Sequence, residues 1–203
     1  MLIRTMSRFD GRAINRALEY KTVSEAGLLP FTKTILGASE WTGSTSSFDL
    51  TPDGHVEPIV AGNNIRAIDT WTSRAALDFT WTTRKVSSGA TAVTFGLFDQ
   101  AEIGSYSDTL DYSGMNTMTN SWFVRNRVNQ TQVWYGNAQQ ALVTNPSNGD
   151  QIRINVTASG TFTLLVNEVV VHTWTQTATV ELALTVGAIN SLGDVMDDVG
   201  MFS

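Results

Sequence analysis

Apolar side chains recur at every second position through most of the chain after residue 71. This spacing places side chains on one face of an extended strand, whereas an amphipathic helix needs spacings of three and four. The alternation is clearest in four runs: Leu77, Phe79 and Trp81; Val93, Phe95 and Leu97; Trp122, Val124 and Val128; and Ile152, Ile154 and Val156. No helical period follows residue 25, so about ten to fourteen short strands are expected. This number predicts an all-β, antiparallel sandwich of two sheets.

The segment 151–174 predicts the clearest local structure, a meander of three strands. Two alternating strands flank the turn signal at Ser159 and Gly160. Asn167 and Glu168 then form a tight turn into a third strand that begins at Val169. One more alternating strand is expected over 180–186.

The first 38 residues differ from the rest and are expected to form an N-terminal arm, with the sandwich over residues 39–203. Ser7 and Asp10 resemble a helix-capping pair, and the apolar residues after them predict a short amphipathic helix near 8–21. The arm carries five basic side chains: Arg4, Arg8, Arg12, Arg16 and Lys21. We expect these side chains to bind an acidic partner. The alternative is that the helix packs on its own sandwich.

Charge is divided unevenly along the chain, whose net charge is −6. Residues 1–21 hold five basic and two acidic side chains, and the remainder holds eight basic and seventeen acidic ones. An acidic body repels nucleic acid, and the arm alone would give only a weak, salt-sensitive contact. Nucleic acid is therefore not an expected partner.

Several classes of site and location are excluded by composition. The chain has no cysteine, which excludes disulfides, thiolate metal sites and a cysteine nucleophile. No stretch approaches the roughly 18 apolar residues of a membrane span, and the start lacks the apolar core of a secretory signal. We expect synthesis in the cytoplasm of a host and no contact with membranes.

The C-terminal half resembles the concanavalin A-like jelly rolls, in particular the laminin-G-type and SPRY-type domains. Three runs carry the resemblance: a strand after a Gly-Asp turn at 148–156, a hairpin with an asparagine at its tip at 161–174, and the closing strand at 196–202. The resemblance implies a jelly-roll sandwich. The calcium and glycan sites of that family are not transferred, because their loops cannot be aligned with particular residues here.

Acidic and histidine side chains offer no recognisable catalytic motif. Asp194, Asp197 and Asp198 could hold a hard cation, but their spacing fits capping of a turn better. A polar stretch, expected to be a long loop, holds four carboxylates that could serve glycoside hydrolysis only if two of them faced each other: Asp99, Glu102, Asp108 and Asp111. His55 in a turn and His172 on a strand lack a nucleophile elbow beside them. The sequence therefore predicts a protein that is not an enzyme and needs no metal or cofactor.

Six tryptophans form the most informative residue class: Trp41, Trp71, Trp81, Trp122, Trp134 and Trp174. Most are expected to pack between the sheets, because sandwich cores use large aromatic side chains. Trp134, Tyr135 and Asn137 are the candidate glycan contacts, since exposed rings stack on sugar faces and polar neighbours bind sugar hydroxyls.

Together these features favour a structural protein of a phage-type virion. The body would be a capsid decoration or cement protein, or a head or tail fibre component, anchored through the arm to other virion proteins and forming a homo-oligomer. The alternative is a lectin-like module that binds a carbohydrate on a host or other surface.

Overall fold

A computed structural model describes residues 33–71, 76–83, 93–105, 117–127, 130–157, 159–188 and 194–202. The predicted arm helix and all five of its basic residues lie outside these ranges. The first described strand, β1 (Lys33–Ile35), pairs with the last strand, β15 (Asp194–Phe202), and so begins within the segment assigned to the arm. Among the described residues, no helix is both long and apolar enough to cross a membrane.

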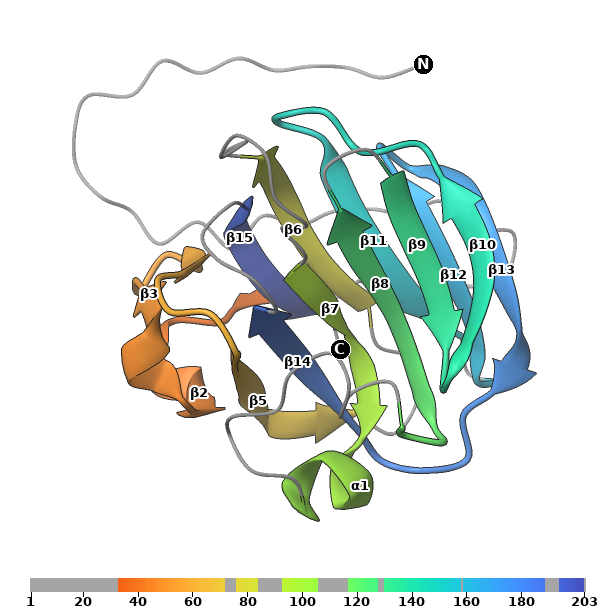
Figure 1. The fold of residues 1–203 in the computed structure, drawn as a ribbon, viewed down its shortest axis with the longest axis horizontal. Helices are drawn as coiled ribbons and strands as arrows, with labels where there is room; N and C mark the ends of the chain where they lie inside the picture. The colour runs from red at the N-terminus through yellow and green to blue at the C-terminus, as the bar shows by residue number, and fades with distance from the viewer. Residues whose placement is uncertain are drawn as a thin grey trace.

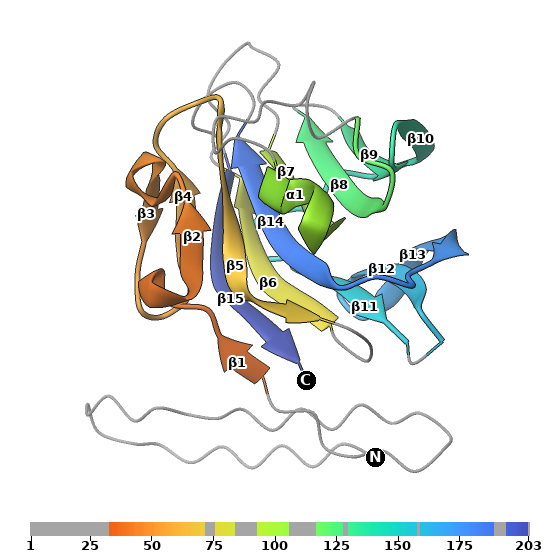
Figure 2. The same cartoon turned by 90° about the horizontal axis from the view of Figure 1, so that it is seen from below.

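The described strands form two antiparallel sheets that lie face to face (Figures 1 and 2). The eight-stranded sheet runs in the order β13 (Val169–Thr177), β12 (Thr161–Val166), β11 (Gln151–Val156), β6 (Ala76–Thr83), β15, β4 (Val56–Pro58) and β3 (Phe48–Leu50), with β1 also on β15. The seven-stranded sheet runs in the order β10 (Ala138–Val143), β9 (Gln130–Tyr135), β8 (Ser121–Arg127), β7 (Val93–Asp99), β14 (Leu182–Ala188), β5 (Asn63–Trp71) and β2 (Trp41–Gly43). The expectation of an all-β, two-sheet sandwich is confirmed.

The predicted meander is present, because β11, β12 and β13 follow one another in the sheet with antiparallel pairing. Asn167 and Glu168 both have positive φ angles, 50° and 65°, which is the backbone of the two-residue turn that suits a twisted hairpin. The Asn167 side chain accepts a hydrogen bond from the Gln151 N–H (2.9 Å) and donates one to Asp150 (2.7 Å). The turn is thus tied to the start of β11.

The main core lies between the sheets and is built from the apolar residues of alternate strand positions. Trp122 of β8 stacks on Phe162 of β12, with ring centroids 4.2 Å apart and planes 8° apart. The Trp174 indole N–H, from β13, donates to the carbonyl oxygen of Trp134 on β9 at 2.9 Å. Trp41, Trp122 and Trp174 are buried, as predicted for core tryptophans, and the contacts of Trp122 and Trp174 join one sheet to the other.

The prediction of a long loop from residue 99 onward is wrong at the beginning of that segment, because a short helix, α1 (Gln100–Ser105), follows β7 directly. The Asp99 carboxylate accepts hydrogen bonds from the backbone N–H groups of Ala101 (2.9 Å) and Glu102 (3.3 Å). An aspartate in this position satisfies amides that the first turn of a helix leaves free. Two short 3-10 turns, Ala38–Glu40 and Thr45–Ser47, are the other helical segments in the described ranges.

Candidate functional site

The three predicted glycan contacts do not share one surface. Side chains alternate along β9, so Trp134 lies on the outer face of the seven-stranded sheet and stacks on Phe123 (6.1 Å, 5°). Tyr135 points inward, toward the ring of Trp122 (5.2 Å, 53°). Asn137 is exposed in the turn that joins β9 to β10. Of the three, Trp134 alone lies on the sheet face described next.

A line of polar side chains crosses the outer face of this sheet beside Trp134. The strand register brings Asn64 opposite Gly187, Gly187 opposite Thr94, Thr94 opposite Arg125, and Arg125 opposite Gln132. Thr185 lies two residues from Gly187 on the same face, opposite Gly96. We call the five side-chain-bearing polar residues the polar face: Asn64, Thr94, Arg125, Gln132 and Thr185.

These polar residues lie on the outer face because the apolar residues between them turn inward. Val93 and Phe95 flank Thr94, and Leu184 and Val186 flank Thr185; all four belong to the core between the sheets. Since neighbouring side chains of a strand point to opposite faces, the threonines must face away from that core. The sheet is thus apolar on one side and polar on part of the other.

The polar face is buried, although polar side chains usually lie on the protein surface. Thr94 and Thr185 have no exposed surface, and Asn64, Gln132 and Arg125 are at most 9 % exposed. Among the described residues, the hydroxyls of Thr94 and Thr185 and the side-chain oxygen of Gln132 have no hydrogen-bond partner. Buried polar atoms are nearly always paired with protein or water, so each exception needs an explanation.

An apolar cluster borders the polar face at the α1 end of the sheet. Phe98, Phe123 and Ala183 on the sheet pack with Ile103 of α1 and with Met118, and Trp134 packs against the cluster. Phe98 and Phe123 stack at 5.3 Å. Gly96 lies between these aromatic rings and Thr185, and a Cβ at this position would collide with the carbonyl oxygen of Trp122. Trp134 therefore stands where the apolar cluster meets the polar face.

Two of the four carboxylates considered for glycoside hydrolysis hold this end of the molecule together. Asp99 accepts hydrogen bonds from the first turn of α1, as described above. The Glu102 carboxylate accepts from the backbone N–H groups of Thr119 (3.0 Å) and Asn120 (3.1 Å). Asp108 and Asp111 lie outside the described residues. Asp99 and Glu102 thus bind main-chain amides and tie α1 to the 117–120 segment.

The two histidines lie far apart in the fold and in different surroundings. His172, on β13, contacts the Trp174 ring edge-on (4.9 Å, 89°), and burial lowers the pKa of His172 below its ordinary value of 6.5. His55 precedes β4, and its Nδ1 lies 2.6 Å from an oxygen of Asp197 on β15. Of the three aspartates considered for a cation, Asp197 meets this histidine. Asp198 is exposed with a positive φ of 55°, and the side chain of Asp194 lies outside the described set.

The polar face was not among the predicted sites, although the sequence carries a signal for it. On β7 and β8, the positions between the inward apolar residues hold polar residues, a glycine and aromatic residues: Thr94, Arg125, Gly96, Phe98 and Phe123. The inward apolar residues are enough to predict the strands. The outward residues of the same strands form the polar face and part of the apolar cluster. Only the strand order brings these residues together with Asn64, Gln132 and Thr185.

Comparison with known proteins agrees with this fold. No family model matches the chain, and no curated protein is similar in sequence. The carbohydrate recognition domain of Emp46p in its metal-free form superposes with a TM-score of 0.58 at 11 % identity, covering 81 % of this chain and 87 % of that one. The carbohydrate-binding module CBM66 from Bacillus subtilis gives 0.51 at 13 % identity, covering 81 % and 96 %. The PSpry domain of TRIM65 gives 0.52 at 15 % identity, covering 74 % and 82 %.

These likenesses, at such low identities, concern the fold. The chain has a concanavalin A-like β-sandwich, as its C-terminal half suggested. A fold does not by itself define an activity, so function must be argued from the surface that the fold presents.

Proposed function

We propose that this protein is a carbohydrate-binding module that contacts its sugar through Trp134 and the neighbouring end of the polar face. The observation that carries the proposal is the partly exposed indole of Trp134 on the outer face of the seven-stranded sheet, next to the polar side chains of Gln132 and Arg125. The likeness to CBM66 and to the Emp46p carbohydrate recognition domain supports it, because the matches cover 96 % and 87 % of those chains and 81 % of this one.

The chemistry of the polar face suits a polyol. Threonine hydroxyls and the amides of Asn64 and Gln132 can both donate and accept hydrogen bonds, and the Arg125 guanidinium donates several. The indole of Trp134 offers a flat apolar surface for the C–H face of a sugar ring. Binding sites for small ligands commonly combine such an aromatic wall with a few polar groups that orient the ligand.

The proposal is binding without turnover. Asp99 and Glu102, the described members of the acidic set considered for hydrolysis, are occupied by backbone amides. A bound oligosaccharide should therefore be recovered intact after prolonged incubation, as judged by chromatography. Cleavage products that appear in proportion to the protein added would contradict this part of the proposal.

The test is a glycan array with the tag-free chain, followed by calorimetry on the best ligand. Gln132→Ala should reduce affinity at least tenfold, since a buried amide that contacts a sugar hydroxyl is lost. Gln151→Ala is the matched control, because Gln151 lies on β11 of the other sheet, next to the inward-facing core residue Ile152, and so faces away from the polar face. Trp134→Ala should also weaken binding, with circular dichroism used to confirm that the variant is folded.

Two results would overturn the proposal. Absence of binding across a broad array would refute the function, and equal affinities for the wild type and the Gln132→Ala and Trp134→Ala variants would refute this location of the binding site.

The expected role as a structural virion protein finds no support in the comparisons, which favour the lectin-like alternative. That role, the homo-oligomer and the anchoring arm remain sequence-based predictions.

A further inference from the structure

Two carboxylates oppose each other on the hairpin of β3 and β4. The register pairs Asp49 with Glu57 directly across the two strands, so their side chains lie on the same face. Like charges in directly opposed positions destabilise an antiparallel pair. Glu57 is also partly buried, with 20 % of its side chain exposed, which reduces the screening of this repulsion by water. The two carboxylates therefore concentrate negative charge at one point of the hairpin.

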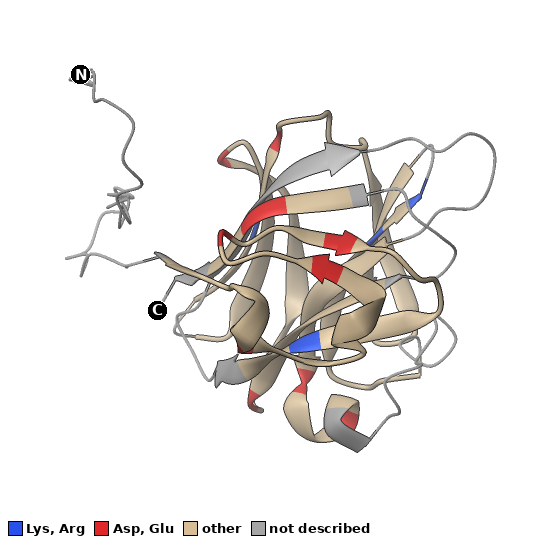
Figure 3. Cartoon of the chain, turned by 90° about the vertical axis from the view of Figure 1, so that its left-hand side faces the viewer, with Lys and Arg blue, Asp and Glu red and all other residues tan. Residues whose placement is uncertain are grey.

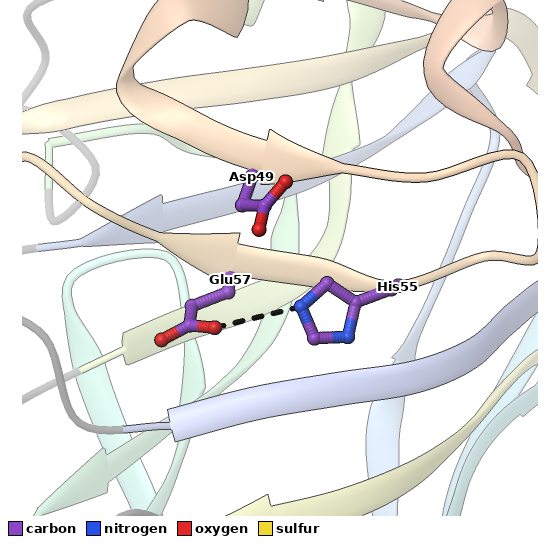
Figure 4. Close-up of side chains that lie close together, drawn as sticks. All are labelled: Asp49, His55 and Glu57. Carbon is purple, nitrogen blue, oxygen red and sulfur yellow. Dashed lines mark ion pairs between the residues drawn. The ribbon is translucent and has the colours of Figure 1, made fainter.

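His55 lies next to this pair and points toward it (Figure 4). It precedes Glu57 by two residues, and this spacing places both side chains on one face. The His55 Nε2 lies 3.5 Å from an oxygen of Glu57. One ligand atom from each of Asp49, His55 and Glu57 can be chosen so that all three lie within 4.8 Å of one another.

Asp197 orients the imidazole from the opposite side. The His55 Nδ1 lies 2.6 Å from the Asp197 carboxylate, which as an anion can only accept, so Nδ1 carries the hydrogen. The Nε2 atom then presents either a lone pair or a second proton toward Glu57. A carboxylate on one ring nitrogen with a metal on the other is the usual arrangement of a metal-binding histidine, because it holds the ring and the tautomer in place.

We propose that Asp49, His55 and Glu57 form a zinc site, with Asp197 as the positioning residue for His55. Zinc–nitrogen and zinc–oxygen bonds of about 2.1 Å at a tetrahedral angle separate the two ligand atoms by about 3.4 Å, close to the observed His55–Glu57 distance. The exposed Asp49 carboxylate completes three protein ligands, and the fourth position is open to water. This site is distinct from the polar face and independent of carbohydrate binding.

The ligand set favours zinc over calcium. Calcium takes six to eight oxygen ligands, whereas this cluster offers one nitrogen and two carboxylates. Imidazole is a preferred ligand of zinc and of its neighbours in the transition series. Figure 3 marks acidic positions in red on the strands that face the viewer, and negative charge there would attract any divalent cation.

A metal here would add a connection at one end of the eight-stranded sheet. The hairpin pairs with β15 at one strand position, Met196 with Val56, and the Gly54 carbonyl oxygen in its turn accepts a hydrogen bond from the Val199 N–H (3.0 Å), whereas β15 and β6 are paired along most of their length. Zinc would connect β3 to β4, and the bond from His55 to Asp197 would extend this connection to β15. Bound zinc should therefore raise the midpoint of thermal unfolding.

The experiment is calorimetric titration of zinc into the full chain, with any histidine tag removed, combined with thermal unfolding. One equivalent should bind saturably and raise the unfolding midpoint. His55→Gln should abolish stoichiometric binding, whereas His172→Gln, at the chain's only other histidine, should leave it unchanged. Asp197→Asn should keep the stoichiometry but weaken affinity about 10–100-fold, as expected for a residue that orients a ligand.

Each remaining outcome contradicts the proposal. Absence of one-equivalent binding to the folded wild type would refute the zinc site. Retained binding in His55→Gln would place the zinc elsewhere, and tighter binding of calcium than of zinc would refute the metal class. Circular dichroism of each variant without metal separates loss of the site from loss of the fold.

Discussion

Thr185 on β14 has a side chain that lowers the stability of the fold. Its hydroxyl is fully buried and has no partner among the described residues. Burying an unpaired hydroxyl costs about 1–3 kcal/mol, so the position is suboptimal for folding.

Replacing Thr185 by valine should therefore stabilise the protein. Thr185→Val keeps the shape of the side chain and removes the unpaired hydroxyl, so the free energy of unfolding should rise by about 1 kcal/mol. Urea denaturation monitored by tryptophan fluorescence measures this change. A decrease of similar size would mean that the hydroxyl already has a protein partner.

His172 makes stability depend on pH through its burial. Because the folded pKa lies below the ordinary value of 6.5, the unfolded chain binds more protons between the two values. The free energy of unfolding should thus fall as the pH drops from about 7.5 to about 5.5. In His172→Gln this decrease should be smaller, because the partly buried imidazole has been removed. Equal pH profiles for the two proteins would show that His172 makes no contribution.

At the scale of elements, the hairpin of β12 and β13 was predictable because its signal is local. Asn167 and Glu168 lie between two alternating runs, and asparagine tolerates the left-handed backbone of such a turn. The helix α1 was not predictable in the same way. Its six residues are too few for a hydrophobic period, and Asp99 and Glu102 hold it through bonds to the backbone.

The turn supports a direct prediction at this scale. Asn167→Ala should lower the free energy of unfolding by about 2 kcal/mol, because alanine is strained at a φ of 50° and the bonds to Gln151 and Asp150 are lost. Asn167→Gly is the control, since glycine removes the bonds without the strain and should cost less. Equal losses in the two variants would indicate that backbone strain is negligible, and chemical denaturation measures both.

At the scale of the whole molecule, each candidate site depends on strands that are distant in sequence. The polar face draws residues from β5, β7, β8, β9 and β14, which are adjacent only through the strand order. The bond from His55 to Asp197 joins residues 142 positions apart. The predicted glycan patch, by contrast, was chosen from neighbours in sequence. Alternation along a strand sent Trp134 and Tyr135 to opposite faces of the sheet.

The amino-acid sequence by itself determined the fold class, the meander and the use of tryptophan in the core. Each of these follows from a period of two, a short turn signal or the size of a side chain, and all three act over a few residues. The tertiary structure alone decided which polar residues meet, because the order of strands in a sheet depends on packing over the whole chain. That packing brings Thr94, Arg125 and Gln132 into one line and places Asp197 behind His55.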